Sequence, residues 1–194
     1  MIRKALVFVF TLATMSHLFA FHANANSCED FANKFLTDSR KHSSISQHRQ
    51  YLANSIDTKH ATKFSLGASW RTLTPEQRKE FYNVYSKYVI YRYVGQFVKY
   101  PVLSYKIIKT EEDPRRKNIC NLTVLIKTIV NKQEKEIPLI SVISTAGNNY
   151  TIQDLAIENI SVLQMQSQEI TSLLKSKGFD STISILKEFV QAQQ

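Results

Sequence analysis

The sequence has 194 residues and a formal net charge of +9, from 25 lysine and arginine residues against 16 aspartate and glutamate residues. This length suits one domain with a sizeable core, and the basic charge suits anionic partners. The dense basic run Arg115-Arg116-Lys117 has no interleaved aromatic residues, which argues against nucleic-acid binding.

Residues 1–25 have the pattern of a secretory signal peptide. Arg3 and Lys4 precede an apolar run over residues 5–21, and Ala23-Asn24-Ala25 places small residues where signal peptidase reads them. We predict cleavage near Ala25, export to the periplasm, and a mature single domain of residues 26–194 with 23 basic and 16 acidic residues. A membrane anchor is the first alternative, but the run is short and no stop-transfer charges follow it. A lipidated Cys28 is the second, although Asn26-Ser27 lacks the usual preceding pattern.

The chain contains two cysteines, Cys28 and Cys120. An oxidising compartment permits a disulfide between them, and closing so long a loop would add about 4 kcal/mol in the chain-entropy model. Cys120 also lies in an apolar strand pattern, where a buried free thiol is ordinary. The sequence leaves both states open.

The first half of the chain has helical patterns. Amphipathic helices are predicted over residues 30–41, 46–54 and 57–70. Thr74, Pro75 and Gln77 then mark the start of a long helix, as an N-cap, a first-position proline and a capping-box residue. Apolar residues recur behind them every four positions, which gives this helix a broad aromatic face: Phe81, Tyr85, Val89, Tyr93 and Phe97.

The second half changes to a strand pattern rich in isoleucine, valine, threonine and tyrosine. Four antiparallel strands are predicted over residues 102–110, 119–130, 136–145 and 150–158, with a tight turn at Gly147-Asn148. Two closing helices follow over residues 163–175 and 181–192, and Gly178 ends the first. The predicted fold is α+β: N-terminal helices, a long amphipathic helix, a four-stranded antiparallel sheet of NTF2-like plan and two C-terminal helices.

Apolar residues occupy both faces of the second and third predicted strands. Leu122, Val124 and Ile126 alternate with Ile119, Leu125 and Ile129, and the third strand behaves in the same way. Both faces therefore need cover. Helices can cover one; the other packs on more helix or lines an apolar cavity.

Two motifs resemble the MlaC, or toluene-tolerance, family. The first is Leu66-Gly67-x-x-Trp70-Arg71-x-x-Thr74-x-x-Gln77-x-x-x-Phe81, continued by Tyr85, Val89, Tyr93, Phe97 and Tyr100. The second is Tyr150-Thr151-Ile152-Gln153-Asp154-Leu155-x-Ile157-Glu158-x-Ile160-Ser161. With Gly178-Phe179-Asp180 at the last helix, the resemblance spans roughly residues 57–186. Tyr150, Asn159 and Gln166-Ser167 depart from the family pattern near the C-terminal helices.

The resemblance implies a periplasmic shuttle that passes a phospholipid between an outer-membrane lipoprotein complex and the substrate-ring subunit of an inner-membrane ABC transporter. It implies no cofactor, no metal and no catalysis, with the phospholipid as cargo and the protein as a monomer. A carrier must bury both acyl tails in an apolar cavity, here between helices and sheet, and leave the headgroup at its mouth. The candidate lipid-binding residues are Trp70, Phe81, Tyr85, Val89, Tyr93, Phe97, Leu122, Val124, Ile126, Ile140 and Val142.

Trp70 and Arg71 are the most specific residues of the first motif. Trp70 is expected to anchor one helix on another, with direct lipid contact as the alternative. Arg71 is expected to form an ion pair with Asp154 or Asp57. The alternative is that Arg71 contacts a partner protein.

Two other classes of function compete with lipid carriage. An NTF2-like enzyme would need an acid or base in the apolar pocket, but His42, His48 and His60 all lie in the helical region and no catalytic motif is present. A ligand-free adaptor would have a filled core. Bound phospholipid, or its absence, separates these classes.

Overall fold

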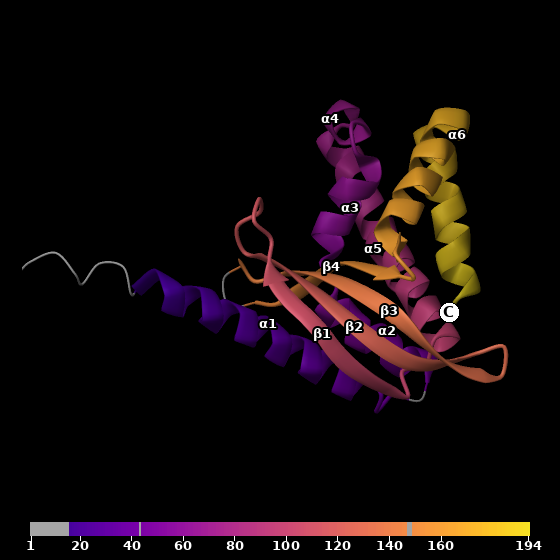
Figure 1. The fold of residues 1–194 in the computed structure, drawn as a ribbon. Helices are drawn as coiled ribbons and strands as arrows, with labels where there is room; N and C mark the ends of the chain where they lie inside the picture. The colour runs from indigo at the N-terminus through magenta and orange to yellow at the C-terminus, as the bar shows by residue number, and fades with distance from the viewer. Residues whose placement is uncertain (1–15, 43, 147–148) are drawn as a thin grey trace, which may run out of the picture.

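The computed structural model describes residues 16–42, 44–146 and 149–194, and Figure 1 shows their arrangement. Most of the predicted signal peptide lies outside the described residues, as does the turn predicted at Gly147-Asn148. The backbone of α1 (Ser16–Ser39) is helical across the predicted cleavage position after Ala25, and cleavage stays a prediction. Within the described ranges, no helix combines the length and apolarity needed to cross a bilayer.

Side-chain caps mark the start of several of the described helices. After α1 come α2 (Ile45–Ser55), α3 (Thr58–Leu66), α4 (Ser69–Thr72) and α5 (Pro75–Lys99). Thr74 and Gln77 form the predicted capping box of α5, with Pro75 in its first turn. Ser44 and Gln47 form a second capping box at α2, which the sequence analysis did not identify.

The sheet has five strands, so the predicted count of four is wrong. They are β1 (Ser104–Glu112), β2 (Ile119–Val130), β3 (Gln133–Ser144), β4 (Thr151–Ile157) and β5 (Ile160–Ser161), and each pairs antiparallel with the next. The fifth has only two residues, too few for any periodicity to reveal. The NTF2-like plan stays a prediction.

The C-terminal segment contains two helices that meet at a kink. The two predicted helices form α6 (Val162–Ala192), and a kink at Gly178 divides it. The φ of Gly178 is 77°, a left-handed value that glycine adopts without a steric cost. Gly178 thus ends the first of the two helices, as the sequence predicts.

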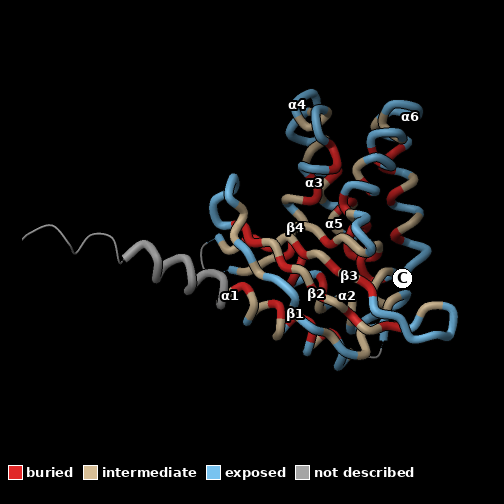
Figure 2. The backbone as a smooth tube through the Cα atoms, viewed as in Figure 1, coloured by how far each residue is buried: buried red, intermediate tan, exposed pale blue. Residues whose placement is uncertain are grey.

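The register of the strands separates the two faces of the sheet. Val124 pairs with Leu139 and Ile126 pairs with Ile137, and these four residues are buried on one face. Strands β1 to β3 cross the front of the view in Figure 1, with α2 and α5 behind them. The helices thus cover one face, while the opposite face is only half-buried, as the tan segments of β2 and β3 in Figure 2 show.

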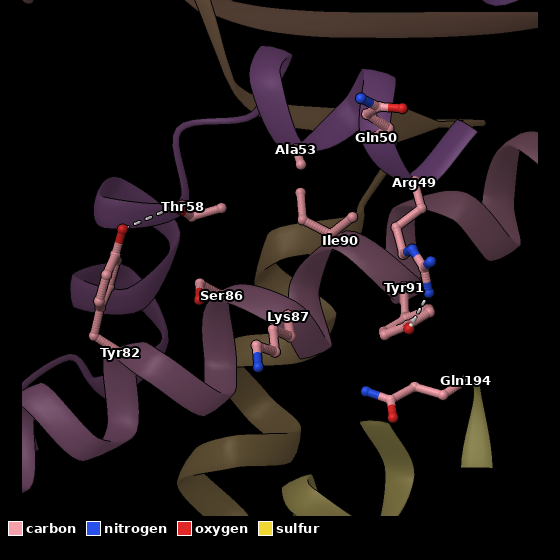
Figure 3. A pocket seen from close by; sticks show the side chains of 10 residues that line it. All are labelled: Arg49, Gln50, Ala53, Thr58, Tyr82, Ser86, Lys87, Ile90, Tyr91 and Gln194. Atoms are coloured by element: carbon pink, nitrogen blue, oxygen red, sulfur yellow. Dashed lines mark hydrogen bonds between the residues drawn. The ribbon is translucent and has the colours of Figure 1, made fainter. Parts of the chain in front are cut away.

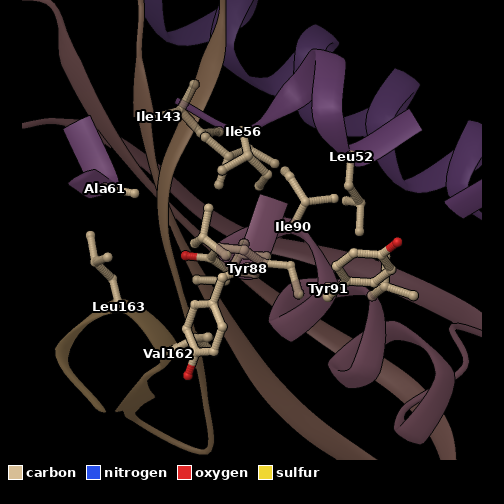
Figure 4. Close-up of a cluster of buried hydrophobic side chains, with 14 of the residues drawn as sticks. Leu52, Ile56, Ala61, Tyr88, Ile90, Tyr91, Ile143, Val162 and Leu163 are labelled. Atoms are coloured by element: carbon tan, nitrogen blue, oxygen red, sulfur yellow. The ribbon is translucent and has the colours of Figure 1, made fainter. Parts of the chain in front are cut away.

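The core lies between this covered face and the helices. Leu52 of α2 and Ile56, which follows that helix, lie in this core. They pack with Ile90 of α5 and Ile143 of β3 (Figure 4). The broad face of α5 is fully buried as its pattern predicts, at Phe81, Tyr85, Val89 and Tyr93.

A disulfide joins α1 to β2. Cys28 and Cys120 are bonded across a sequence separation of 92 residues, and both are buried. Cys120 lies on the same covered face as Leu122 and Val124, so the bond holds α1 against that face. The choice that the sequence left open is therefore settled in favour of the bridge.

Candidate functional site

An apolar space lies between the C-terminal half of α5 and the covered face of the sheet. The residues that line it come from α5, the segment between α5 and β1, the strands β2 to β4, and the start of α6: Tyr93, Gln96, Phe97, Tyr100, Val102, Ile126, Leu139, Leu155, Ile157 and Val162. Its volume is only ≈ 20 Å³, which is room for about one water molecule. Among the described residues, the space at this position is therefore far smaller than the large cavity expected from the sequence.

A second space adjoins the first across two shared side chains. Phe97 and Val102 line both the interior space and an open pocket of ≈ 310 Å³. Phe97 is half-buried, and its ring contacts that of Phe35 on α1 edge-on at 5.8 Å. Phe97 and Val102 therefore stand between the interior space and the open pocket.

The open pocket has polar groups at its rim. Arg40, His42 and His48 line it beside the apolar Ile45 and Val98. Arg40 is exposed and has no carboxylate within ion-pair distance in the described ranges. The Nε2 atom of His42 is buried and has no hydrogen-bond partner there either. This pocket thus offers a cation and an unpaired polar atom next to the apolar interior.

A hollow larger than either of these two spaces lies elsewhere, and its lining differs. It measures ≈ 710 Å³ and lies between α2, the start of α3 and α5 (Figure 3). Arg49, Gln50 and Lys87 line it, and Arg49 Nη1 donates a hydrogen bond of 2.6 Å to the Tyr91 hydroxyl. Apolar residues such as Ile90 line it as well, so its wall is mixed, and a hydrocarbon tail there would take the charged groups out of water.

The predicted lipid-binding residues fall into four groups. Tyr93, Phe97 and Ile126 line the interior space, and Val89, Leu122 and Val124 are buried beside it in the same core. Phe81 and Tyr85 pack at the other end of α5, where the Tyr85 hydroxyl donates to Gln166 Oε1 at 3.0 Å. Trp70 lies on α4, half-buried between Lys63 and Arg78. Ile140 and Val142 lie on the opposite sheet face.

The predicted set therefore does not form one wall. Ile140 pairs with Thr123 and Val142 pairs with Asn121, so neither shares a face with Val124. The residues that replace them are Leu139, Leu155 and Ile157. The alternation in β3 offered both parities, and only the pairing register distinguishes them.

Asp154 fixes the start of α6 above the interior space. Its Oδ1 accepts hydrogen bonds from the backbone of Leu155 at 2.8 Å and of Leu163 at 3.1 Å, and its Oδ2 accepts one from Ser161 Oγ at 2.5 Å. Ser161 is in turn the N-cap of α6 and accepts from Gln164 N at 2.9 Å. The second sequence motif thus joins β4 to α6.

Arg71 does not contribute to that junction. Asp154 uses both carboxylate oxygens at the start of α6, and Asp57 caps α3 through His60 N at 2.9 Å. Neither carboxylate has an ion pair with Arg71 in the described part of the chain, and Arg71 is exposed. The predicted pairing is wrong: Asp57 caps α3, and Asp154 bonds to the N-cap Ser161 and to the first turn of α6.

Burial raises the pKa of Asp154, against the lowering effect of its hydrogen bonds. A raised pKa in the folded state means that protonation stabilises the fold; this contribution is complete below the unfolded pKa and is lost as the pH rises through the folded pKa. We expect wild type to gain stability over Asp154→Asn as the pH falls through that window. Urea unfolding of both proteins across acidic pH measures the difference; a difference that grows with rising pH would contradict the assignment.

The titratable residues offer no metal centre. Within the described ranges, no three histidine, cysteine, aspartate or glutamate side chains are grouped to hold an ion. The rings of His42 and His48 lie 5.7 Å apart, while His60 contacts Phe64 on α3. Burial lowers the pKa of His60, which favours its neutral form.

Fold and site together define an α+β protein in which helices and one face of an antiparallel sheet enclose a small apolar space. The family model described as MlaC protein matches residues 29–188, and the chain belongs to this family. The resemblance inferred from the two motifs is thereby confirmed.

A solved structure shares the fold. It is described as the phospholipid-binding protein from Ralstonia solanacearum in complex with a phospholipid. The TM-score is 0.65 at 14% sequence identity, over 88% of this chain and 97% of that one. No curated protein sequence matches the chain.

Proposed function

We propose that this protein is a periplasmic phospholipid carrier, with the tails held between α5 and the covered face of the sheet. The observation that carries the proposal is the apolar lining at that position in a member of the MlaC family. The phospholipid in the similar Ralstonia solanacearum protein supports it. Two acyl chains of about 16 carbons would cost on the order of 25 kcal/mol to expose to water, so a carrier must enclose them.

Entry of the tails requires the interior to open. A cavity of ≈ 20 Å³ is far below the roughly 300–1,000 Å³ of ordinary ligand sites. Phe97 and Val102 separate it from the pocket of ≈ 310 Å³, and both belong to the end of α5 and the following loop. The lipid enters on this route by displacing the two side chains, and they then contact its tails.

The headgroup remains in the open pocket. Arg40 and His42 line that pocket, and an arginine can bind a phosphodiester through two parallel hydrogen bonds. Few contacts are needed there, because the tails supply most of the binding free energy. This arrangement permits several headgroups on one carrier.

The cellular role follows from the family resemblance. The signal peptide exports the protein, and the mature domain passes lipid between an outer-membrane complex and the ring subunit of an inner-membrane ABC transporter. This transfer maintains the lipid asymmetry of the outer membrane. Enzymatic action is disfavoured because, among the described residues, the lining of the interior space contains no carboxylate, histidine, lysine or cysteine. Its titratable lining groups are tyrosine hydroxyls, and burial raises the pKa of Tyr93 well above its ordinary value.

Solvent extraction of the purified protein tests the proposal. We expect mass spectrometry of the extract to detect phospholipid at close to one molecule per chain. Delipidated protein incubated with phospholipid vesicles should regain the same amount. Protein that stays empty in both cases would instead support a ligand-free adaptor, and a chemically altered lipid would support an enzyme.

A further inference from the structure

A groove at the far end of α5 combines an aromatic floor with a cluster of cations. We call it the Trp70 groove; its lining includes Lys59, Lys63, Trp70, Arg78, Lys79 and Tyr82. It has a volume of ≈ 290 Å³ and lies between α3 and the first turns of α5, next to α4. Figure 1 shows this end of α3 and α4 projecting away from the sheet.

The cations of the groove are held in place without a carboxylate. Lys63 Nζ and Arg78 Cζ lie 5.9 and 5.2 Å from the centre of the Trp70 ring. Arg78 Nη2 donates to the backbone oxygen of Arg71 at 3.3 Å, while Arg78 Nε is buried and unpaired in the described structure. Two positive charges thus lie against the Trp70 ring, and Lys59 and Lys79 line the same groove.

The acidic residues close by in sequence do not neutralise the groove. Glu80 binds Lys187 of α6 at 2.9 Å, and Glu76 is exposed in the first turn of α5. None of the four groove cations has a carboxylate within ion-pair distance in the described ranges, and no carboxylate lines the groove. The site is therefore complementary to a negative ligand.

We propose that the Trp70 groove is the docking site for an acidic segment of a partner protein. Carboxylates of that segment bind Lys63, Arg78 and Lys79, and its apolar groups contact the Trp70 ring. Tryptophan, tyrosine and arginine are the residues that dominate protein interfaces, because they combine large apolar area with directional polar groups. The surrounding charge also steers an acidic partner toward the site.

The position of the groove favours a protein over a lipid bilayer as its binding partner. Arg78 and Gln96 are 18 positions apart on α5, a separation of about 27 Å along the helix. The groove is thus remote from the apolar interior and its open pocket. A bilayer bound at the groove would lie away from the lipid entrance. A partner protein can bind at the groove while the entrance stays free. The choice of a protein over a bilayer is the one part of this inference that rests on the proposed function.

Trp70 provides a direct probe, because it is the single tryptophan of the sequence. We expect a fluorescein-labelled peptide of alternating glutamate and glycine to alter Trp70 emission and to bind with an affinity that falls as salt rises. A glutamine and glycine peptide should not bind. The double substitution Lys63→Glu and Lys79→Glu should weaken binding about tenfold or more.

The matched control reverses the same number of charges elsewhere. Lys106→Glu with Lys135→Glu alters exposed positions of β1 and β3 and should leave peptide affinity within about twofold. If both double variants weakened peptide binding equally, the effect would come from the net charge of the protein and not from the groove, and the proposal would be overturned. Absence of peptide binding, or binding only to vesicles of phosphatidylglycerol, would overturn it too.

Lipid content distinguishes this inference from the carrier proposal. The Lys63→Glu and Lys79→Glu variant should retain the wild-type amount of extracted phospholipid and the wild-type urea midpoint. If wild type carries lipid but ignores the peptide, the groove inference alone fails. If the peptide binds to protein that never carries lipid, the carrier proposal alone fails.

Discussion

Ile157→Arg is expected to abolish phospholipid binding while the protein still folds. Ile157 ends β4, is half-buried and lines the interior space. Because it is not fully buried, the arginine can turn its guanidinium toward solvent in the empty protein. With lipid present the same charge lies beside the tails without a partner, at a cost of at least ~3 kcal/mol, or roughly a hundredfold in affinity.

Ile140→Arg is the matched control. Ile140 is also half-buried, and it pairs with Ala156, the neighbour of Ile157, but on the opposite face of the sheet. We expect this variant to retain wild-type lipid content in extracts and in reloading from vesicles. Circular dichroism and urea unfolding of both variants show whether each is folded.

The pair of variants decides which face of the sheet contacts the tails. Loss of lipid in Ile140→Arg with retention in Ile157→Arg would place the cargo on the open face and contradict the proposed site. If both variants retained the wild-type amount of lipid, the acyl tails would not contact β4 on either face. Val124 is less suitable for this experiment, because it is fully buried and a charge there would unfold the protein.

Removal of the disulfide is expected to cost about 2–5 kcal/mol of the free energy of unfolding. Cys28 and Cys120 close a loop of 92 residues, and opening it restores conformational freedom mainly to the unfolded chain. The double substitution Cys28→Ser and Cys120→Ser should therefore unfold at lower urea. Wild type measured with a reducing agent should behave in the same way.

We expect the variant without the disulfide to lose stability but to keep its fold, because α1 makes other contacts with the rest of the protein. Phe31 stacks on Tyr150 with ring centres 5.6 Å apart, and Phe35 stacks on Tyr51 at 5.4 Å. These aromatic contacts should keep α1 in place when the sulfur atoms are removed. Reaction of unfolded, unreduced wild type with a thiol reagent checks the premise, and two free thiols would contradict it.

Local signals in the sequence determined most of the secondary structure. Thr74, Pro75 and Gln77 act within one turn of α5, and the aromatic spacing behind them reports a helix face. The strands β1 to β4 follow from residue type and turns. Gly178 marks the kink in α6, because the kink depends only on the backbone conformation of that one residue. The two motifs identified the family before any coordinates.

Tertiary structure decided what depends on residues far apart in the chain. Leu139 and Ile140 are equally apolar, and only the pairing of β3 with β2 and β4 turns the first toward the helices. The Cys28–Cys120 bond depends on α1 lying against β2.

The two candidate sites have the same origin. The closed interior depends on Phe97 and Val102 meeting residues of the distant strands, and the Trp70 groove joins lysines of α3 to charges of α5. Sequence periodicity reports the face of one element, because it reflects the local backbone geometry. Sites depend on which faces meet, and long-range packing alone sets that.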